Sequence, residues 1–225
     1  MMNHWRKFTV YKNGFTLSEV LITLVIIGIV AAVTIPTLIN NTKKNEFVAG
    51  LKKANSVLSQ AILKIGQSKG YPVGDYSFLK DIDFADEFVK VVNVNQKCNN
   101  FAECSGKNLS QYKFINGNSV SGVNDSGKSV ITSDGQLFSF LSIGIISFGT
   151  YGISSEDSDN RLVRILVDLN GPKNPNKFGY DTFIFYIINN KGIIPAGSAS
   201  YSNCASWSSG ETCAARVLKE NAINY

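Results

Sequence analysis

The stretch of residues 20–39 contains no charged side chain, and it constrains the fold of this 225-residue chain more than any other feature. It has the roughly 20 apolar residues that a membrane-spanning helix needs, and as an α-helix it would be about 30 Å long. Arg6, Lys7 and Lys12 precede the stretch, and no acidic residue stands among them. Because basic residues stay on the cytoplasmic side, the sequence predicts a single-pass membrane protein with an extracytoplasmic head.

A cleavable secretory signal is the alternative interpretation of a basic leader followed by an apolar stretch. The stretch is longer than the roughly 7–15 residues of a signal-peptide core. The small residues Ala31 and Ala32 lie inside it and mark no clean cleavage site. Glu19 stands directly before it, where signal peptides seldom carry an acid. These features favour an apolar helix that remains in the mature protein, and they leave an unprocessed signal anchor open.

The residues that lead into the apolar stretch, 12–21, read KNGFTLSEVL. This segment resembles the processing site of type IV prepilins and type II secretion pseudopilins, with Gly14, Phe15 and Glu19 at the positions characteristic of that family. The resemblance is strong over residues 12–66 and weaker beyond them. It implies that a membrane prepilin peptidase cuts after Gly14 and methylates the new amino terminus at Phe15. Glycine suits such a cut because it leaves the backbone open to the peptidase.

Glu19 has two interpretations, which are compatible with each other. Thr16 stands three residues before it, and this spacing is the sequence signature of a helix capping box. In the pilin family, the matching glutamate pairs with the free amino terminus of a neighbouring subunit. A charge at the centre of a bilayer costs about 2.5–3.5 kcal/mol on insertion scales, and such residues usually serve a function. The resemblance therefore implies that Glu19 directs assembly.

Beyond the apolar stretch, the pattern predicts that one helix continues from Phe15 to about Ile65. Pro36 lies within it and should kink or loosen the helix, because proline removes a backbone donor. Apolar residues then recur at spacings of three and four, which indicates an amphipathic helix. These residues are Phe47, Leu51, Ala54, Leu58, Ala61 and Ile65. The expected parts of the chain are a leader peptide (1–14), a transmembrane and filament-core helix (15–39), an amphipathic second half of that helix (40–66) and a globular head (67–225).

The head is expected to be α+β, with the long helix packed on a small antiparallel sheet. Residues 78–92 predict a second, short helix. Three to five strands are expected, and the clearest segments are 130–132, 137–141, 161–169 and 182–188. The first two form a predicted hairpin, and the near-continuous apolar run 138–148 indicates heavily buried sheet segments. A helix followed by such strands also resembles the head of a pilin.

Four cysteines, Cys98, Cys104, Cys204 and Cys213, fall into two close pairs. Their C-x5-C and C-x8-C spacings differ from the C-x2–4-C spacing of zinc sites. Disulfides persist outside the cytoplasm, so among the three possible connectivities we favour the local bonds Cys98–Cys104 and Cys204–Cys213. Free buried thiols are the alternative.

The most distinctive segment of the head, residues 167–181, reads VDLNGPKNPNKFGYD. It is similar to a loop of many pilin-like proteins, and some major pseudopilins bind calcium in a head loop. Asp168, Asn170 and Asp181 could supply oxygen ligands to calcium, which takes six to eight of them. The segment departs from that pattern because it has only two carboxylates and several lysines. The alternative is a metal-free turn, built by Asx side chains and Gly-Pro.

Composition argues against several classes of function. His4 is the single histidine, which excludes a histidine-based triad or a multi-histidine metal site, and no G-x-S-x-G motif occurs, so no enzyme is expected. The net charge of +5 is small and scattered, so nucleic-acid binding is not expected. Removing the basic leader would leave a nearly neutral chain. Trp207, Tyr201 and Phe178 are single aromatic candidates for surface contacts, and residues 116–129 indicate an exposed loop.

The sequence therefore predicts a structural subunit of a type IV pilus or of a type II secretion pseudopilus. Its expected partners are other pilin-like subunits in a homo- or hetero-polymer, the prepilin peptidase and the inner-membrane assembly machinery. After assembly it would lie in a filament at the cell surface or in the periplasm. The alternative is a monomeric, membrane-anchored extracellular adhesin or binding module.

Overall fold

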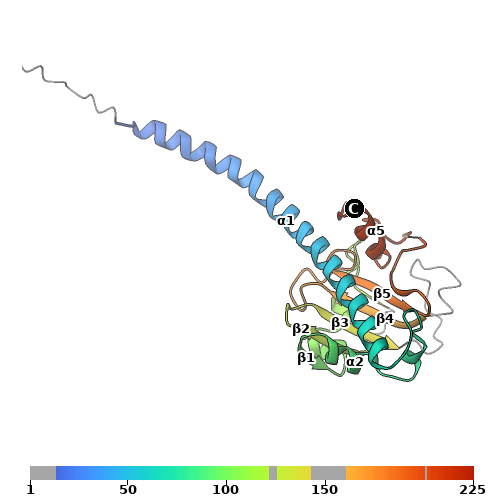
Figure 1. Cartoon of the computed structure of the whole chain (residues 1–225). Coiled ribbons are helices and arrows are strands. Elements are labelled where there is room, and N and C mark those ends of the chain that lie inside the picture. The colour runs from blue at the N-terminus through green and yellow to red at the C-terminus, as the bar shows by residue number, and fades with distance from the viewer. Residues whose placement is uncertain (1–13, 122–125, 143–160, 201) are drawn as a thin grey trace, which may run out of the picture. The chain divides into compact units, whose positions relative to one another are not determined.

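The computed structural model describes residues 14–121, 126–142, 161–200 and 202–225 (Figure 1). The chain divides into two compact units, Met1–Lys43 and Lys44–Tyr225. Helix α1 (Leu17–Ser68) contributes its first part to the first unit and its second part to the second. The expected single long helix is therefore confirmed, and it extends to Ser68 instead of ending near residue 65.

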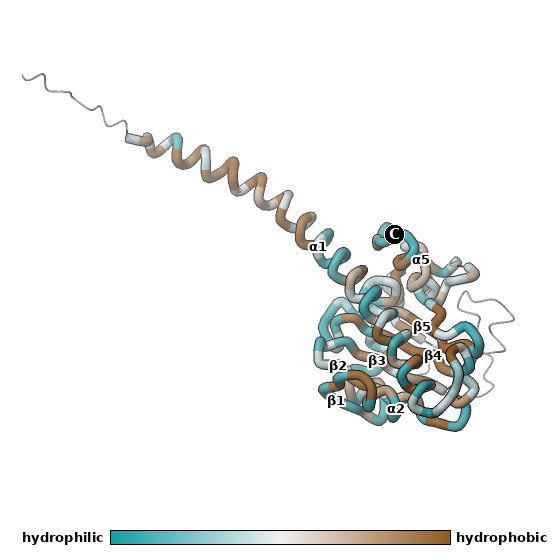
Figure 2. Tube along the Cα trace, in the orientation of Figure 1, coloured by the Kyte–Doolittle hydropathy of each residue, from teal (hydrophilic) through white to brown (hydrophobic). Residues whose placement is uncertain are grey.

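In the first unit, α1 carries the apolar stretch and is long and apolar enough to cross a membrane. Figure 2 shows this part of the helix as predominantly hydrophobic. Pro36 lies inside the helix, and the helical assignment continues on both sides of it. The apolar stretch therefore stays helical through Pro36, and the expected kink or loosening at this residue stays a prediction.

In the second unit, α1 buries the stripe of apolar residues that the sequence predicts. Leu51, Ala54 and Leu58 are fully buried, and Phe47, Ala61 and Ile65 are nearly so. These side chains belong to one core cluster with Phe138 and Phe185 of the sheet. Burying such a side chain contributes about 1.5–3 kcal/mol, so the stripe fixes the second half of α1 on the sheet.

The sheet has six antiparallel strands in the order β1-β2-β3-β4-β5-β6, so each strand pairs with its neighbours along the chain. The strands are β1 (Val94–Cys98), β2 (Lys128–Thr132), β3 (Leu137–Ser142), β4 (Arg161–Asp168), β5 (Thr182–Ile188) and β6 (Gly192–Pro195). The four expected strands and the β2–β3 hairpin are confirmed, and the α+β class with them. The expected number of three to five strands was too low, because the described residues form six and the short edge strands β1 and β6 were not predicted.

Both faces of the sheet are covered, which explains why β5 is apolar at nearly every position. Phe183, Phe185 and Ile187 face the core that contains α1. Ile184, Tyr186 and Ile188 alternate with them and face a second core. Helices α2 (Phe84–Val91) and α5 (Cys213–Glu220) contribute to the α1 core. Helix α3 (Phe101–Ser105) and the 3-10 helix η2 (Leu109–Gln111) contribute to the second.

The predicted helix over residues 78–92 is wrong in one respect, because two elements occupy this range. The 3-10 helix η1 (Ser77–Lys80) comes first, and α2 follows it. Asp83 separates them, since its extended backbone places its carboxylate to accept hydrogen bonds from the N–H groups of Ala85 and Asp86, at 3.0 and 3.4 Å. An aspartate at an N-cap stabilises a helix start at that position.

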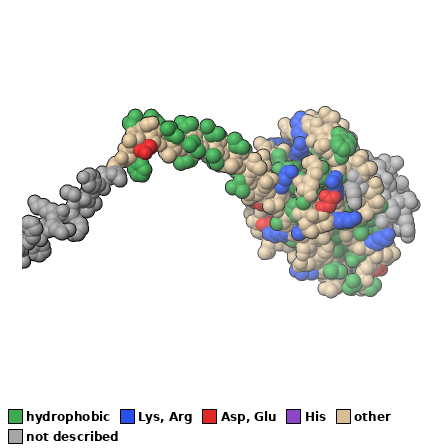
Figure 3. Space-filling view, turned by 90° about the horizontal axis from the view of Figure 1, so that it is seen from above, with side chains coloured by type: hydrophobic (Ala, Val, Ile, Leu, Met, Phe, Trp, Pro, Cys, Tyr) green, Lys and Arg blue, Asp and Glu red, His purple; other side chains and the backbone are tan. Residues whose placement is uncertain are grey.

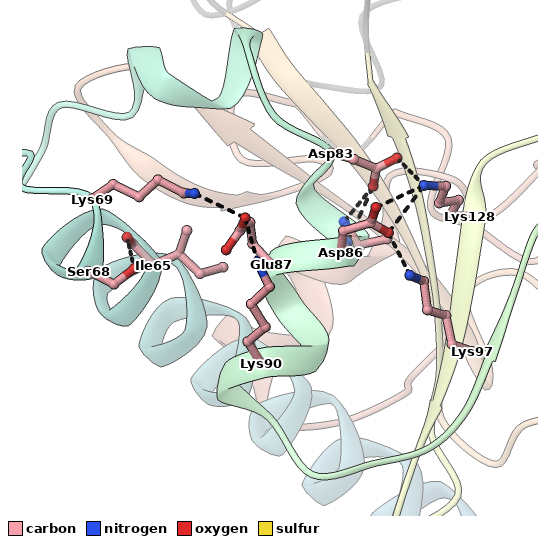
Figure 4. Close-up of polar contacts among 10 residues, drawn as sticks. Ile65, Ser68, Lys69, Asp83, Asp86, Glu87, Lys90, Lys97 and Lys128 are labelled. Carbon is pink, nitrogen blue, oxygen red and sulfur yellow. Dashed lines mark hydrogen bonds and ion pairs between the residues drawn. The ribbon is translucent and has the colours of Figure 1, made fainter.

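Seven charged side chains on α2 and on the segments next to it form ion pairs (Figure 4). We call this group the α2 ion-pair cluster, and it comprises Lys69, Asp83, Asp86, Glu87, Lys90, Lys97 and Lys128. Asp86 lies 2.7 Å from Lys97 of β1 and 3.1 Å from Lys128 of β2, and these contacts lower the pKa of its carboxyl. The cluster thus links α2 to the edge of the sheet.

We expect Asp86→Asn to lower the free energy of unfolding by about 0.5–1 kcal/mol, because partly exposed ion pairs contribute little more. The loss should shrink in 1 M salt, which screens such pairs. Since the folded pKa of Asp86 is lowered, its contribution is present above the ordinary aspartate pKa of about 3.9 and is lost as the pH falls through the folded value.

Urea unfolding of the detergent-solubilised chain at several salt concentrations and pH values measures this effect. Asp81→Asn is the matched control, because Asp81 is exposed and has no ion pair within the described part of the chain. Equal losses for Asp81→Asn and Asp86→Asn would contradict a specific role for the cluster.

Candidate functional site

The peptide bond between Gly14 and Phe15 lies in an open, extended segment directly before α1. Phe15 is 89% exposed, and no atom lies within 4 Å of the position that a Cβ would take at Gly14. The chain itself therefore leaves this bond accessible to a peptidase. Residues 1–13, which hold the predicted basic leader, lie outside the described residues.

Thr16 and Glu19 form the capping box at the start of α1. Glu19 Oε2 accepts hydrogen bonds from the backbone N–H and the hydroxyl of Thr16, at 2.9 and 2.8 Å. The Thr16 hydroxyl oxygen in turn accepts from the backbone N–H of Glu19, at 3.2 Å. These reciprocal bonds satisfy donors that a helix start leaves free. The structural interpretation of Glu19 is thus observed in the single chain.

Hydrophobic side chains make up much of the surface of the apolar part of α1 (Figure 3). Every large apolar side chain between Phe15 and Ile39 is exposed, for example Leu24 at 60% and Val33 at 71%. The hydroxyls of the threonines in and just after this part form hydrogen bonds with the backbone of the same helix. Thr23, Thr34, Thr37 and Thr42 donate to backbone carbonyl oxygens three or four residues earlier. The helix therefore satisfies its polar groups internally, as a segment in lipid must.

Residues 10–35 match the family model described as the prokaryotic N-terminal methylation motif. The chain carries the prepilin-type signature of type IV pilins and pseudopilins. The matched residues include Gly14, Phe15, Thr16 and Glu19 and most of the apolar stretch, so the signature coincides with the accessible bond and the capping box. No curated protein and no solved structure matches the chain.

The head has two disulfides, and both are the favoured local pairs. Cys98 at the end of β1 is bonded to Cys104 of α3, and Cys204 is bonded to Cys213 at the start of α5. Arg216 also donates to the carbonyl oxygen of Cys204, at 2.7 Å. The first bond therefore connects the end of a strand to a short helix, and the second connects an irregular segment to a short helix. Free cysteines are absent from the described residues.

Asp168 and Asp181, two of the three residues considered for calcium, are completely buried. Asp168 accepts hydrogen bonds from the Tyr112 hydroxyl, at 2.7 Å, and from the backbone N–H of Asn170, at 3.3 Å. Asp181 accepts from the backbone N–H groups of Asn176 and Lys177, at 2.8 and 2.6 Å. Each of the four carboxylate oxygens is therefore already engaged by a protein donor.

The engagement of both aspartates favours the metal-free turn over the calcium site. Asn170, the third candidate ligand, donates through Nδ2 to the carbonyl oxygen of Asn174 at 2.9 Å, whereas its Oδ1 is buried with no hydrogen-bond partner in the described residues. Within the ranges that the structure describes, no group of three His, Cys, Asp or Glu residues is placed to hold a metal. Calcium binding by Asp168, Asn170 and Asp181 stays a prediction.

Burial changes the titration of both aspartates. It raises the pKa of Asp168 well above the ordinary value, and the nearby charge of Asp181 adds to this effect. Burial likewise raises the pKa of Asp181, to about 6. A raised folded pKa means that the contribution of these groups to stability is fully present below their unfolded pKa of about 3.9 and is lost as the pH rises through the folded values.

We expect Asp168→Asn to stabilise the head at pH 7, by roughly 1–3 kcal/mol, because it removes a buried charge, keeps the bond from Asn170 and reverses the bond with Tyr112. The asparagine oxygen can accept from Asn170, and its amide can donate to the Tyr112 hydroxyl. The difference from the original chain should disappear near pH 4, and unfolding curves of the full chain at pH 4 to 8 measure it. A lower stability of Asp168→Asn at pH 7 would show that the fold requires the ionised carboxylate.

The aromatic candidates behave differently from one another. Phe178 is fully buried in the second core, whereas Trp207 is 80% exposed in the loop closed by the Cys204–Cys213 bond. Tyr201, residues 122–125 of the expected loop and residues 143–148 of the apolar run lie outside the described residues. The α2 ion-pair cluster and the contact of Tyr112 with Asp168 were not predicted from the sequence. Most of the residues that form these contacts are distant in the chain, and no spacing rule relates them.

Proposed function

We propose that this chain is a structural subunit of a type IV pilus or a type II secretion pseudopilus. The observation that carries the proposal is a prepilin-type signature placed on an accessible Gly14–Phe15 bond, directly before an exposed apolar helix. In this proposal, residues 1–14 are the leader, 15–39 the transmembrane and filament-core helix, 40–66 its amphipathic half and 67–225 the head. Prepilin peptidase removes the leader and methylates Phe15.

The exposed apolar surface of α1 is compatible with polymerisation as well as with membrane anchoring. Lipid covers this surface before assembly, and neighbouring copies of the helix, or helices of related subunits, replace the lipid in the filament. Because lipid tails are as apolar as these side chains, the exchange is driven by close packing and by polar contacts between helices, and little by the hydrophobic effect. Such a transfer requires the helix to remain in the mature protein, which cleavage after Gly14 achieves.

Glu19 provides the specificity that apolar packing lacks. A carboxylate buried in an apolar filament core is costly unless a cation pairs with it. Cleavage creates a cationic amine at Phe15, and N-methylation of an amine preserves its charge. We propose that Glu19 pairs with this amine on a neighbouring subunit and thereby sets the axial register. Pro36 would allow local loosening of the helix during packing.

Deleting the coding sequence and scoring two phenotypes tests the proposal. Loss of surface filaments with normal protein secretion supports a pilus subunit, and accumulation of secreted proteins in the periplasm supports a pseudopilus subunit. If the deletion changes neither phenotype, and the chain of the parent strain is a monomer in the membrane fraction, the proposal is wrong. The anchored binding module then takes its place.

A further inference from the structure

The side chain of Lys107 contacts a loop more than sixty residues away in the sequence. The backbone of Lys107 is fixed by the residues directly before it. Gly106, with a φ of 67°, ends α3 in the left-handed region and turns the chain. Ser105 then brackets Lys107, because its hydroxyl donates to the Lys107 carbonyl oxygen at 2.6 Å and accepts from the Lys107 N–H at 3.1 Å.

Three oxygens of the loop 172–176 converge on the Lys107 ammonium. Nζ lies 3.2 Å from the carbonyl oxygen of Pro172 and 3.4 Å from Oδ1 of Asn174. When the Asn176 amide is oriented so that Nδ2 donates to the Lys173 carbonyl oxygen at 2.8 Å, its Oδ1 lies 2.7 Å from Nζ. This orientation replaces the bond from Asn176 Nδ2 to Asn174 Oδ1 and brings the two amide oxygens to 3.1 Å from each other, with the ammonium as their shared donor. An ammonium has three N–H donors, so the number of oxygens matches the number of donors.

These oxygens are themselves fixed by other contacts of the loop. Asn176 is 4% exposed, and its N–H donates to Asp181. Asn170 Nδ2 donates to the carbonyl oxygen of Asn174 at 2.9 Å. No carboxylate in the described ranges forms an ion pair with Lys107. The ammonium is therefore bound by neutral oxygens, in the way a small cation would be.

We infer that Lys107 is the built-in cation of this loop: its ammonium occupies a three-oxygen site formed by Pro172, Asn174 and Asn176 and orders residues 170–177 without a bound metal. Lys107 is thus a positioning residue, which joins the end of α3 to the loop between β4 and β5.

Hydrogen exchange on the full chain in detergent tests this inference. In Lys107→Met, the protection of the Asn170, Asn176 and Lys177 amides should fall by about tenfold or more, since local opening becomes easier. Lys113→Met is the matched control, because Lys113 donates to Ser119 at 2.9 Å and has no contact with the three oxygens. Unchanged protection in Lys107→Met would overturn the inference.

A chemical variant separates the charge of Lys107 from its packing. The four cysteines of the chain are paired in two disulfides, so Lys107→Cys introduces a single free thiol. Alkylation with 2-bromoethylamine restores an ammonium at nearly the original length, whereas alkylation with 2-bromoethanol adds a neutral group of similar size.

We expect the amine adduct to restore protection and the neutral adduct to leave it low, while a chelator leaves the original chain unchanged. Equal restoration by both adducts would overturn the inference, and so would opening of the original loop by the chelator.

Discussion

Replacing Glu19 with alanine is expected to abolish incorporation into filaments while cleavage after Gly14 continues. The variant retains the accessible Gly14–Phe15 bond and the apolar helix, so peptidase and membrane still recognise it. It lacks the carboxylate that would pair with the amine of a neighbouring subunit, and an amine left unpaired in an apolar core costs several kcal/mol. Immunoblots of the sheared surface fraction measure assembly, and the mass of the membrane-bound chain measures cleavage.

Glu19→Gln distinguishes the two roles of the residue. Glutamine at the third helical position still completes a capping box with Thr16, but it carries no charge. We therefore expect Glu19→Gln to fail in assembly as Glu19→Ala does. Glu46→Gln, which neutralises an exposed glutamate farther along α1, should assemble normally. Normal assembly of Glu19→Gln would mean that the capping box alone explains this position.

Replacing Gly14 with valine is expected to stop processing completely. A side chain at this position would meet no atom of the described part of the chain, so the fold and the membrane insertion should be unaffected. The peptidase, in contrast, would no longer meet an open glycine backbone at the bond it cuts. The chain should then accumulate in the membrane with its leader attached, and intact-mass measurement detects it.

Gly28→Val is the matched control for this experiment. Gly28 is also free of neighbouring atoms and lies within the apolar helix, beyond the cleavage bond. Its variant should be cleaved at the normal rate, whatever its effect on helix packing. Efficient removal of the leader from Gly14→Val would show that the cut occurs elsewhere.

The parts of the fold that follow a periodic pattern could be predicted from the sequence. The stripe from Phe47 to Ile65 has the helical period, and the structure buries it. The β2–β3 hairpin follows from two apolar runs around a Ser-Asp-Gly turn. The division of residues 78–92 could not be predicted as easily, because it depends on the Asp83 cap within a continuous amphipathic pattern.

The contacts that organise the head depend on residues distant in sequence. Tyr112 reaches Asp168 across the second core, and Lys107 reaches Asn176 through a side-chain amide. No spacing rule relates such partners. The Asx residues and lysines of the segment 167–181 are visible in the sequence, but the sequence does not indicate which side chains form hydrogen bonds with each other. The processing segment is different, because Gly14, Phe15, Thr16 and Glu19 lie within six consecutive residues at the start of α1 and their contacts are local.

Mass spectrometry of the amino terminus tests the central claim most directly. The sample is the chain recovered from sheared surface or periplasmic filaments, digested and sequenced from its first residue. The proposed function predicts a mature chain that begins at an N-methylated Phe15. A filament-free membrane fraction in which the chain begins at Met1 would contradict it.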